Sequence, residues 1–138
     1  MKKILVSAVL AALAFPACAE FVVIVNPKNP VASLTAEQVA SVFLGRSTSF
    51  PAGGNATPLD QKEGTPLRDE FYTKATDKNP GQVKAYWAKQ MFSGKGSPPR
   101  ELASSADVKH AVAGDVNAIG YIEKSAVDST VKAVLTVQ

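Results

Sequence analysis

Cysteine and histidine are almost absent from this sequence. Among 138 residues there is one cysteine, Cys18, and one histidine, His110. Structural and catalytic metal sites usually need several such ligands, so we expect no metal site and no cofactor. A single cysteine can form no disulfide within the chain, and the stability of the fold must therefore come from packing.

The sequence also lacks the common motifs of catalysis. It has no Gly-x-Ser-x-Gly, which a serine hydrolase of the α/β type would show. Asp60, Glu63, Asp69 and Glu70 could be interpreted as paired general acids, but two of them fall in the first turn of a predicted helix, where negative charge suits the helix dipole. We therefore predict no catalytic residues and no enzyme.

No run of lysines and arginines is interleaved with aromatic residues, so nucleic acid is not an expected partner. The formal net charge of +3 includes Lys2 and Lys3, and without them 13 basic residues stand against 12 acidic ones. The remaining chain is thus nearly neutral.

The one long apolar run lies at the start, where Lys2 and Lys3 precede residues 4–15. This pattern predicts a secretory signal peptide over residues 1–19, cut after the small-x-small step at 17–19, and a periplasmic location for the protein. The run is shorter than the roughly 20 residues that span a bilayer. The alternative is a lipid anchor at Cys18, although the residues before it differ from the usual lipoprotein pattern.

Residues 20–138 have the length of one domain, without a repeat or a linker. The first apolar, β-branched run suits a strand that is buried on both faces of a parallel sheet. Strands are predicted at 21–26, 56–61, 117–122 and 131–137. Helices are predicted at 34–45, 65–75, 79–94 and 104–114.

The predicted helices have recognisable beginnings. Thr35 with Gln38 and Asn79 with Gln82 have the spacing of capping boxes, and Thr65 is predicted to cap a third helix. In the helix at 79–94 the apolar stripe is Val83, Trp87 and Met91, and we expect Trp87 and Phe92 to lie in the core.

Strands alternating with helices predict an α/β layered domain with a partly parallel sheet. Ligands of such sheets bind beyond the carboxyl ends of strands, near helix N-termini, which is where residues 60–66 fall. The amides of Gly64, Thr65, Leu67 and Arg68 and the Thr65 hydroxyl could converge on an oxyanion there, with the Arg68 guanidinium reaching back to it. The alternative is an ordinary helix cap, and Glu63 would repel an anion.

Four segments together resemble a known family: "LTAEQVASVFLGR", "EGTPLRDEFY", "YWAKQMFSGKGSPPRE" and "VNAIGYIEKS". They are similar to the substrate-binding proteins of bacterial phosphate ABC transporters, and in particular to short single-lobe members of the PBP-like superfamily. The resemblance implies one lobe of a type 2 periplasmic-binding-protein-like fold, with a mixed, mostly parallel sheet and flanking helices. It also implies a non-catalytic, periplasmic protein that binds phosphate or a similar oxyanion.

The resemblance implies an anion-binding set of Glu63, Gly64, Thr65 and Arg68. Full-length members have an Arg followed by Ser-Gly-Thr at a helix N-terminus, and here Gly64 and Thr65 match the last two, while Glu63 replaces the Ser and Leu59 the Arg. Protonated phosphate could donate a hydrogen bond to Glu63 or Asp60, whereas sulfate could not.

Partners follow from the same resemblance. A transporter or another envelope protein is expected, and because the chain supplies one lobe where full-length members close two lobes over phosphate, a homodimer could complete the cleft. The rival interpretation is a ligand-free periplasmic interaction module that kept the lobe fold.

Overall fold

The computed structural model describes residues 20–137, and the predicted signal peptide at 1–19 lies outside them. The strands are β1 (Phe21–Val25), β2 (Thr57–Gln61), β3 (Arg100–Leu102), β4 (Ala118–Glu123) and β5 (Lys132–Val137). The helices are α1 (Ala36–Phe43), α2 (Pro66–Thr76), α3 (Pro80–Phe92), α4 (Ser105–Ala113) and the short 3₁₀ helix η1 (Lys124–Ala126). All the strands and helices predicted from the sequence are present, and β3 and η1 are additional.

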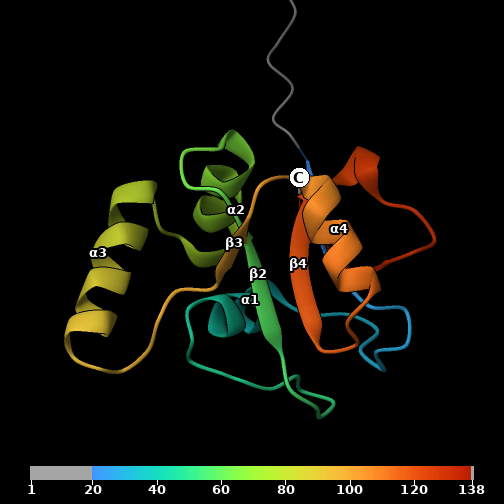
Figure 1. Cartoon of the computed structure of the whole chain (residues 1–138), viewed down its shortest axis with the longest axis horizontal. Coiled ribbons are helices and arrows are strands. Elements are labelled where there is room, and N and C mark those ends of the chain that lie inside the picture. Colours follow the sequence, from blue (N-terminus) through green and yellow to red (C-terminus); the bar gives the residue numbers. More distant parts are fainter. Residues whose placement is uncertain (1–19, 138) are drawn as a thin grey trace, which may run out of the picture.

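The strands form one mixed sheet in the order β3-β2-β4-β1-β5 (Figure 1). Strand β1, between β4 and β5, runs antiparallel to both of them, whereas β2 runs parallel to β4 and β3. The expected mixed α/β fold is confirmed, but the prediction that β1 belongs to a parallel arrangement was wrong. A strand that is buried on both faces is apolar whether its neighbours run parallel or antiparallel to it. The apolar sequence of β1 could therefore not distinguish a parallel from an antiparallel arrangement.

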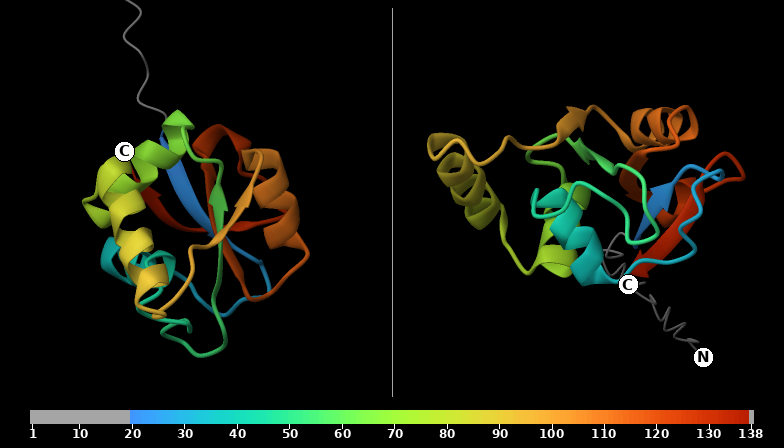
Figure 2. Two further views of the ribbon diagram at one scale, coloured as in Figure 1. Left: turned by 60° about the vertical axis from the view of Figure 1, so that its left-hand side comes forward. Right: turned by 90° about the horizontal axis from the view of Figure 1, so that it is seen from below.

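Helices cover both faces of the sheet (Figure 2). Alternate residues of β1 point to opposite sides: Phe21, Val23 and Val25 pack with α1, α2 and α3, whereas Val22 and Ile24 pack with α4. All five are at most 2% exposed. The core is therefore in two layers, one on each side of β1. No helix within residues 20–137 is long and apolar enough to cross a membrane.

Local signals account for three of the helix beginnings, because side chains cap α1, α3 and, through Ser104, α4. Both predicted capping boxes are present, at the start of α1 and of α3. Thr65 occupies the capping position of α2, but its side chain caps no amide. Its hydroxyl instead donates to the Lys62 carbonyl at 2.9 Å, because the preceding turn brings that oxygen within reach.

The outer end of α3 differs from the prediction. Val83 and Trp87 are buried as expected, but Met91 is 54% and Phe92 97% exposed. Phe92 follows Trp87 by five residues, which at about 100° per residue turns it well away from the packed side. Met91 lies in the last turn of α3, where it lines a cavity together with Val83 and Trp87.

Candidate functional site

The predicted anion-binding residues lie where β2 ends and α2 begins. Gly64 has a φ of +89°, a conformation that other residues rarely adopt, and a Cβ added there would meet no atom within 4 Å. This glycine lets the chain reverse direction into α2 and leaves the turn exposed to solvent. Thr65 and Pro66 then start the helix.

The donors of this turn are only partly free. The Thr65 amide donates to the Lys62 carbonyl at 3.3 Å, and the Thr65 hydroxyl donates to the same oxygen. Within residues 20–137 the amides of Gly64, Leu67 and Arg68 have no protein acceptor. The donors open to an anion are therefore the glycine amide and the first-turn amides of α2, rather than those of Thr65.

Arg68 does not reach back over the turn. Its Nη1 atom donates to the Gln61 carbonyl at 3.1 Å and to the Glu101 carboxylate, and its Nε atom lies 4.0 Å from the Asp60 carboxylate. The side chain is 12% exposed. Arg68 is directed toward the end of β2 because a buried carboxylate there needs a positive neighbour.

That carboxylate, Asp60, is the most unusual group of the site. It is 1% exposed and accepts hydrogen bonds from the Tyr72 and Tyr121 hydroxyls and, at 2.8 Å, from the Gln61 amide. Burial raises the pKa of Asp60, against the hydrogen bonds of Tyr121 and Tyr72 and the charge of Arg68, which lower it.

The two tyrosines are well suited to remain protonated donors. Burial, followed by the negative charge of Asp60, raises the pKa of both Tyr72 and Tyr121. The Tyr121 ring stacks on Phe71, with centroids 3.9 Å apart and planes 4° apart. Their hydroxyls are thus held at Asp60 by rings that are fixed in the core.

Gln61 connects this cluster to the opposite side of the sheet. Its side-chain amide donates to the Tyr121 carbonyl at 2.9 Å and to the Ser105 hydroxyl at 3.1 Å. It therefore ties β2 to β4 and to the start of α4. The carboxyl end of β2 is in this way rigid, while the turn that follows it is open.

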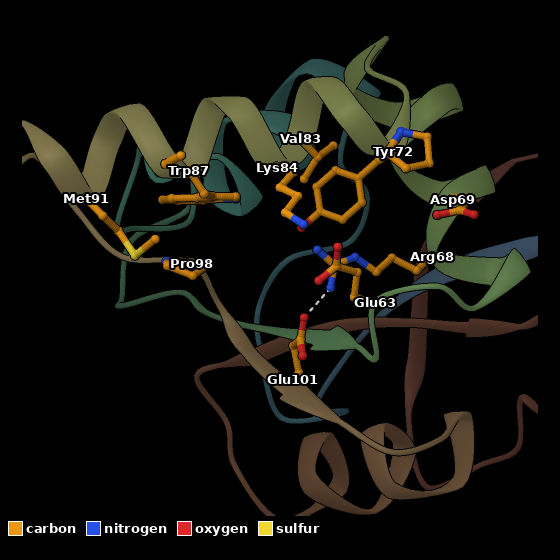
Figure 3. A pocket seen from close by; sticks show the side chains of 12 residues that line it. Glu63, Arg68, Asp69, Tyr72, Val83, Lys84, Trp87, Met91, Pro98 and Glu101 are labelled. Carbon is orange, nitrogen blue, oxygen red and sulfur yellow. Dashed lines mark hydrogen bonds and ion pairs between the residues drawn. The ribbon is translucent and has the colours of Figure 1, made fainter.

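A cavity of about 240 Å³ lies beside the cluster, between α2, α3 and β3 (Figure 3). Glu63 and Arg68 line it, but Gly64 and Thr65 do not. Its other lining residues are Asp69, Tyr72, Pro80, Val83, Lys84, Trp87, Ala88, Met91, Pro98 and Glu101. One side of the cavity is apolar and the other carries charges of both signs, so the four predicted site residues are neighbours but do not share one hollow.

Sequence reasoning missed most of the buried cluster. Asp60 was considered only as an acceptor for phosphate or one of several acids, whereas it is closed off from solvent. Tyr72, Tyr121 and Glu101 lie 12, 61 and 41 positions from it in the chain, so no motif could join them. The one local indication was a carboxylate within a predicted strand, and in the structure it lies in the buried second half of β2.

No protein-family model and no curated protein matches the chain. Solved structures do match. A protein from Clostridium perfringens, assigned as a phosphate ABC transporter substrate-binding protein and solved with bound phosphate, matches 83% of this chain with 27% identity and a TM-score of 0.65. An ABC-type phosphate transport receptor from Vibrio cholerae also matches 83% of it, with 21% identity and a TM-score of 0.65. PstS from Borrelia burgdorferi matches the same share with 12% identity and a TM-score of 0.56.

The match covers only part of these proteins: 44%, 45% and 46% of their respective chains. Their common fold over this span is the one seen here, with a mixed sheet covered by helices on both faces. The chain therefore has a PBP-like fold and resembles the substrate-binding proteins of phosphate ABC transporters over less than half of their length.

Proposed function

We propose that this protein is exported to the periplasm and there binds phosphate or a similar small oxyanion without catalysing a reaction. The observation that carries the proposal is the match of 83% of the chain to a transporter protein solved with phosphate bound. The residue pattern at the start of the chain, which is typical of a signal peptide, supports export.

The proposed site is the turn from Glu63 to Arg68. The open amides of Gly64, Leu67 and Arg68 lie at the N-terminal end of α2, where the helix dipole favours an anion. Glu63 would accept a hydrogen bond from protonated phosphate, a contact that sulfate cannot make. Phosphate should therefore be preferred to sulfate.

Arg68 is a cation of the first turn of α2, and Glu101 competes for it. The guanidinium already contacts the Glu101 carboxylate and lies 4.0 Å from Asp60. Glu101 is 44% exposed and lies on the short strand β3, so an incoming anion could displace it. We expect weak binding by one chain, because the site is open to water, which weakens charged hydrogen bonds.

Thermal unfolding with added phosphate tests the proposal. A ligand that binds only the folded state stabilises it by RT ln(1 + [L]/Kd), about 2.7 kcal/mol at a concentration of 100 Kd. We expect phosphate to raise the unfolding temperature and sulfate to raise it less. The absence of any shift at millimolar phosphate would refute binding.

Two variants with opposite expected effects locate the site. Arg68→Gln should weaken phosphate binding, and Glu101→Gln should strengthen it by about fivefold, the equivalent of about 1 kcal/mol for a partly exposed ion pair. Tighter binding cannot result from a damaged fold. Arg46→Gln and Glu37→Gln, at exposed positions elsewhere, are the matched controls. Equal affinities in all four variants would place the site outside this turn.

A second candidate is a ligand-free interaction module with the same fold. It is favoured by the contacts of Arg68, whose charge is already matched by Glu101 and Asp60 within the chain. In that case neither phosphate nor sulfate should stabilise the protein, and the periplasmic partner would be a transporter component or another envelope protein.

A further inference from the structure

Helix α3 has a second apolar face, on the side that points away from the protein. Val83 and Trp87 form the buried face. At about 100° per residue, Ala85, Ala88 and Phe92 lie on the opposite face, and all three are exposed. An ordinary surface helix would carry polar residues there.

Lysines flank this apolar stripe. Lys89 is exposed and lies at one edge of it, whereas Lys84, at the other edge, lines the cavity between α2, α3 and β3 and points into it (Figure 3). We call the set of Ala85, Ala88, Lys89 and Phe92 the outer face of α3. Apolar residues with a basic edge are found on helices that lie on membrane surfaces.

Phe92 is the most exposed large apolar side chain in the described part of the chain. It is 97% exposed and its neighbour Met91 is 54% exposed, while the third such residue, Val116, lies elsewhere and is 44% exposed. Two adjacent apolar side chains in solvent, where α3 ends, are not explained by the packing of the fold.

Positive charge is concentrated on the same part of the chain. Residues 78–100 contain five basic residues and no acidic one, whereas the rest of residues 20–138 contains eight basic and twelve acidic residues. Among the ion pairs between residues 20 and 137, none involves these five. Lys78 lies over the Tyr86 ring, 5.4 Å from its centroid, Lys84 lines the cavity, and Lys89, Lys95 and Arg100 are exposed.

The position of α3 makes this surface accessible. The helix lies at one end of the molecule in every view, with the loop of residues 93–99 beside it (Figures 1 and 2). The Lys95 amide donates to the Gln90 carbonyl at 2.9 Å, which keeps Lys95 close to the end of α3. Phe92 therefore has Lys89 one turn before it and Lys95 just after it.

We propose that the outer face of α3 binds the surface of an anionic phospholipid membrane. Phe92 enters the interface between headgroups and acyl chains, and Lys89 and Lys95 contact lipid phosphates. An acidic protein would offer the same charge, but it would also need a surface shaped to fit. The outer face has small side chains, one protruding aromatic ring and a basic edge, and a membrane requires no more than these. This inference does not depend on phosphate binding at Gly64.

Co-sedimentation with lipid vesicles tests the proposal. The full chain is expressed and purified, and all variants are compared with the same N-terminus. We expect binding to phosphatidylcholine vesicles that contain roughly a third phosphatidylglycerol, and little binding to pure phosphatidylcholine. The binding should be strong at about 0.01 M salt and largely lost at about 1 M salt, where charges are screened within a few ångströms.

Variants separate the apolar from the basic contribution. Phe92→Ser should lower the partition coefficient by about tenfold. Lys89→Gln and Lys95→Gln should each lower it by about fivefold. Val116→Ser and Lys28→Gln, at exposed positions away from α3, are the matched controls and should change nothing. Trp87, the only tryptophan, packs on the other face of α3, so its emission shows that the helix remains docked in each variant.

Three results would overturn the proposal: no binding to the anionic vesicles at low salt, binding that the α3 variants leave unchanged, or equal binding to both kinds of vesicle. Binding to polyglutamate but not to vesicles would assign the outer face to an acidic protein instead of a membrane.

Discussion

Asp60 determines much of the arrangement at the end of β2. A carboxylate that is 1% exposed must be compensated by donors or by an opposite charge, and here two tyrosine hydroxyls, one amide and Arg68 all serve it. The same contacts direct Arg68 inward, away from the Gly64 turn. Asp60 is buried and would not itself contact a ligand, but it holds Arg68 and so limits how far Arg68 is available to an anion.

Removal of one tyrosine hydroxyl should be costly. In Tyr121→Phe the ring can still stack on Phe71, but Asp60 loses a buried donor, and we expect a loss of about 1–3 kcal/mol in the free energy of unfolding. Urea unfolding measures it. Tyr86→Phe is the matched control, because its hydroxyl donates to an uncharged carbonyl, that of Leu44, at 2.6 Å, and should cost about 0.5–1.5 kcal/mol. A larger loss in the control would contradict this role for Asp60.

A second carboxylate predicts a dependence of stability on pH. The Thr130 hydroxyl, Lys109 and the Thr130 amide donate to Asp128 and lower its pKa from 3.8 to about 2. The folded state therefore binds a proton on Asp128 more weakly than the unfolded state does. The contribution of the Asp128 carboxylate to the stability of the fold is fully present above pH 3.8 and is lost as the pH falls through about 2.

The comparison is made with Asp128→Asn, by urea unfolding between about pH 5 and pH 2. The free energy of unfolding of the wild-type protein should exceed that of Asp128→Asn at the higher pH, and the difference should shrink as the solution becomes acidic. At low pH the Asp128 carboxyl is protonated, so Lys109 and Thr130 then face a neutral acid. Asp77→Asn, at another exposed aspartate, controls for general charge effects. A constant difference between wild type and Asp128→Asn across the range would contradict the prediction.

At the scale of elements, the sequence predicted what local contacts control. The capping boxes at Thr35 and Asn79 depend on neighbours within a few residues, and both are present. Strand β3 was missed because three partly exposed residues carry no periodicity, and its pairing with β2 alone defines it. The direction of the neighbours of β1 is likewise a property of the whole sheet.

In the candidate site, too, the sequence predicted the features that depend on local contacts but not those that depend on distant residues. The Gly64 turn could be located from the sequence because glycine, threonine and proline have local preferences that start a helix there. The direction of Arg68 could not, since it depends on Asp60 beneath it and Glu101 on β3. Anion binding by Glu63, Gly64, Thr65 and Arg68 stays a prediction.

Gly120 in β4 is required by the close approach of α4. A Cβ at this position would lie 2.4 Å from the Val108 Cγ1 atom, which is fully buried and on a side chain with restricted rotamers. We expect Gly120→Ala to lower the free energy of unfolding by about 1–3 kcal/mol. Chemical denaturation measures the change.

Two comparisons make this prediction specific. Gly114→Ala should be tolerated, because its nearest atom would be 3.7 Å away. Combining Gly120→Ala with Val108→Ala should cost less than the sum of the two single changes, since the smaller side chain makes room for the new methyl group. Strict additivity would show that the strand, rather than the contact with α4, requires glycine.

At the scale of the molecule, the chain matches only part of the transporter protein that it resembles. The match takes in 83% of this chain but only 44% of the phosphate-bound transporter protein. A site formed by one such unit leaves the anion partly in water, where each charged hydrogen bond is weaker than in an enclosed cleft. Tight binding would therefore require a second surface to cover the turn at Gly64.

We expect a second copy of the chain to provide that surface when phosphate is present. If two copies enclose one anion, the apparent affinity for phosphate rises with protein concentration, because association and binding are linked. Calorimetry at two protein concentrations should then give one phosphate per two chains, and the mass in solution should double on addition of phosphate but not of sulfate. If the mass stays that of one chain at saturating phosphate, the single unit binds alone. Glu101→Gln would then remain the more direct route to higher affinity, since it acts within one chain by freeing Arg68.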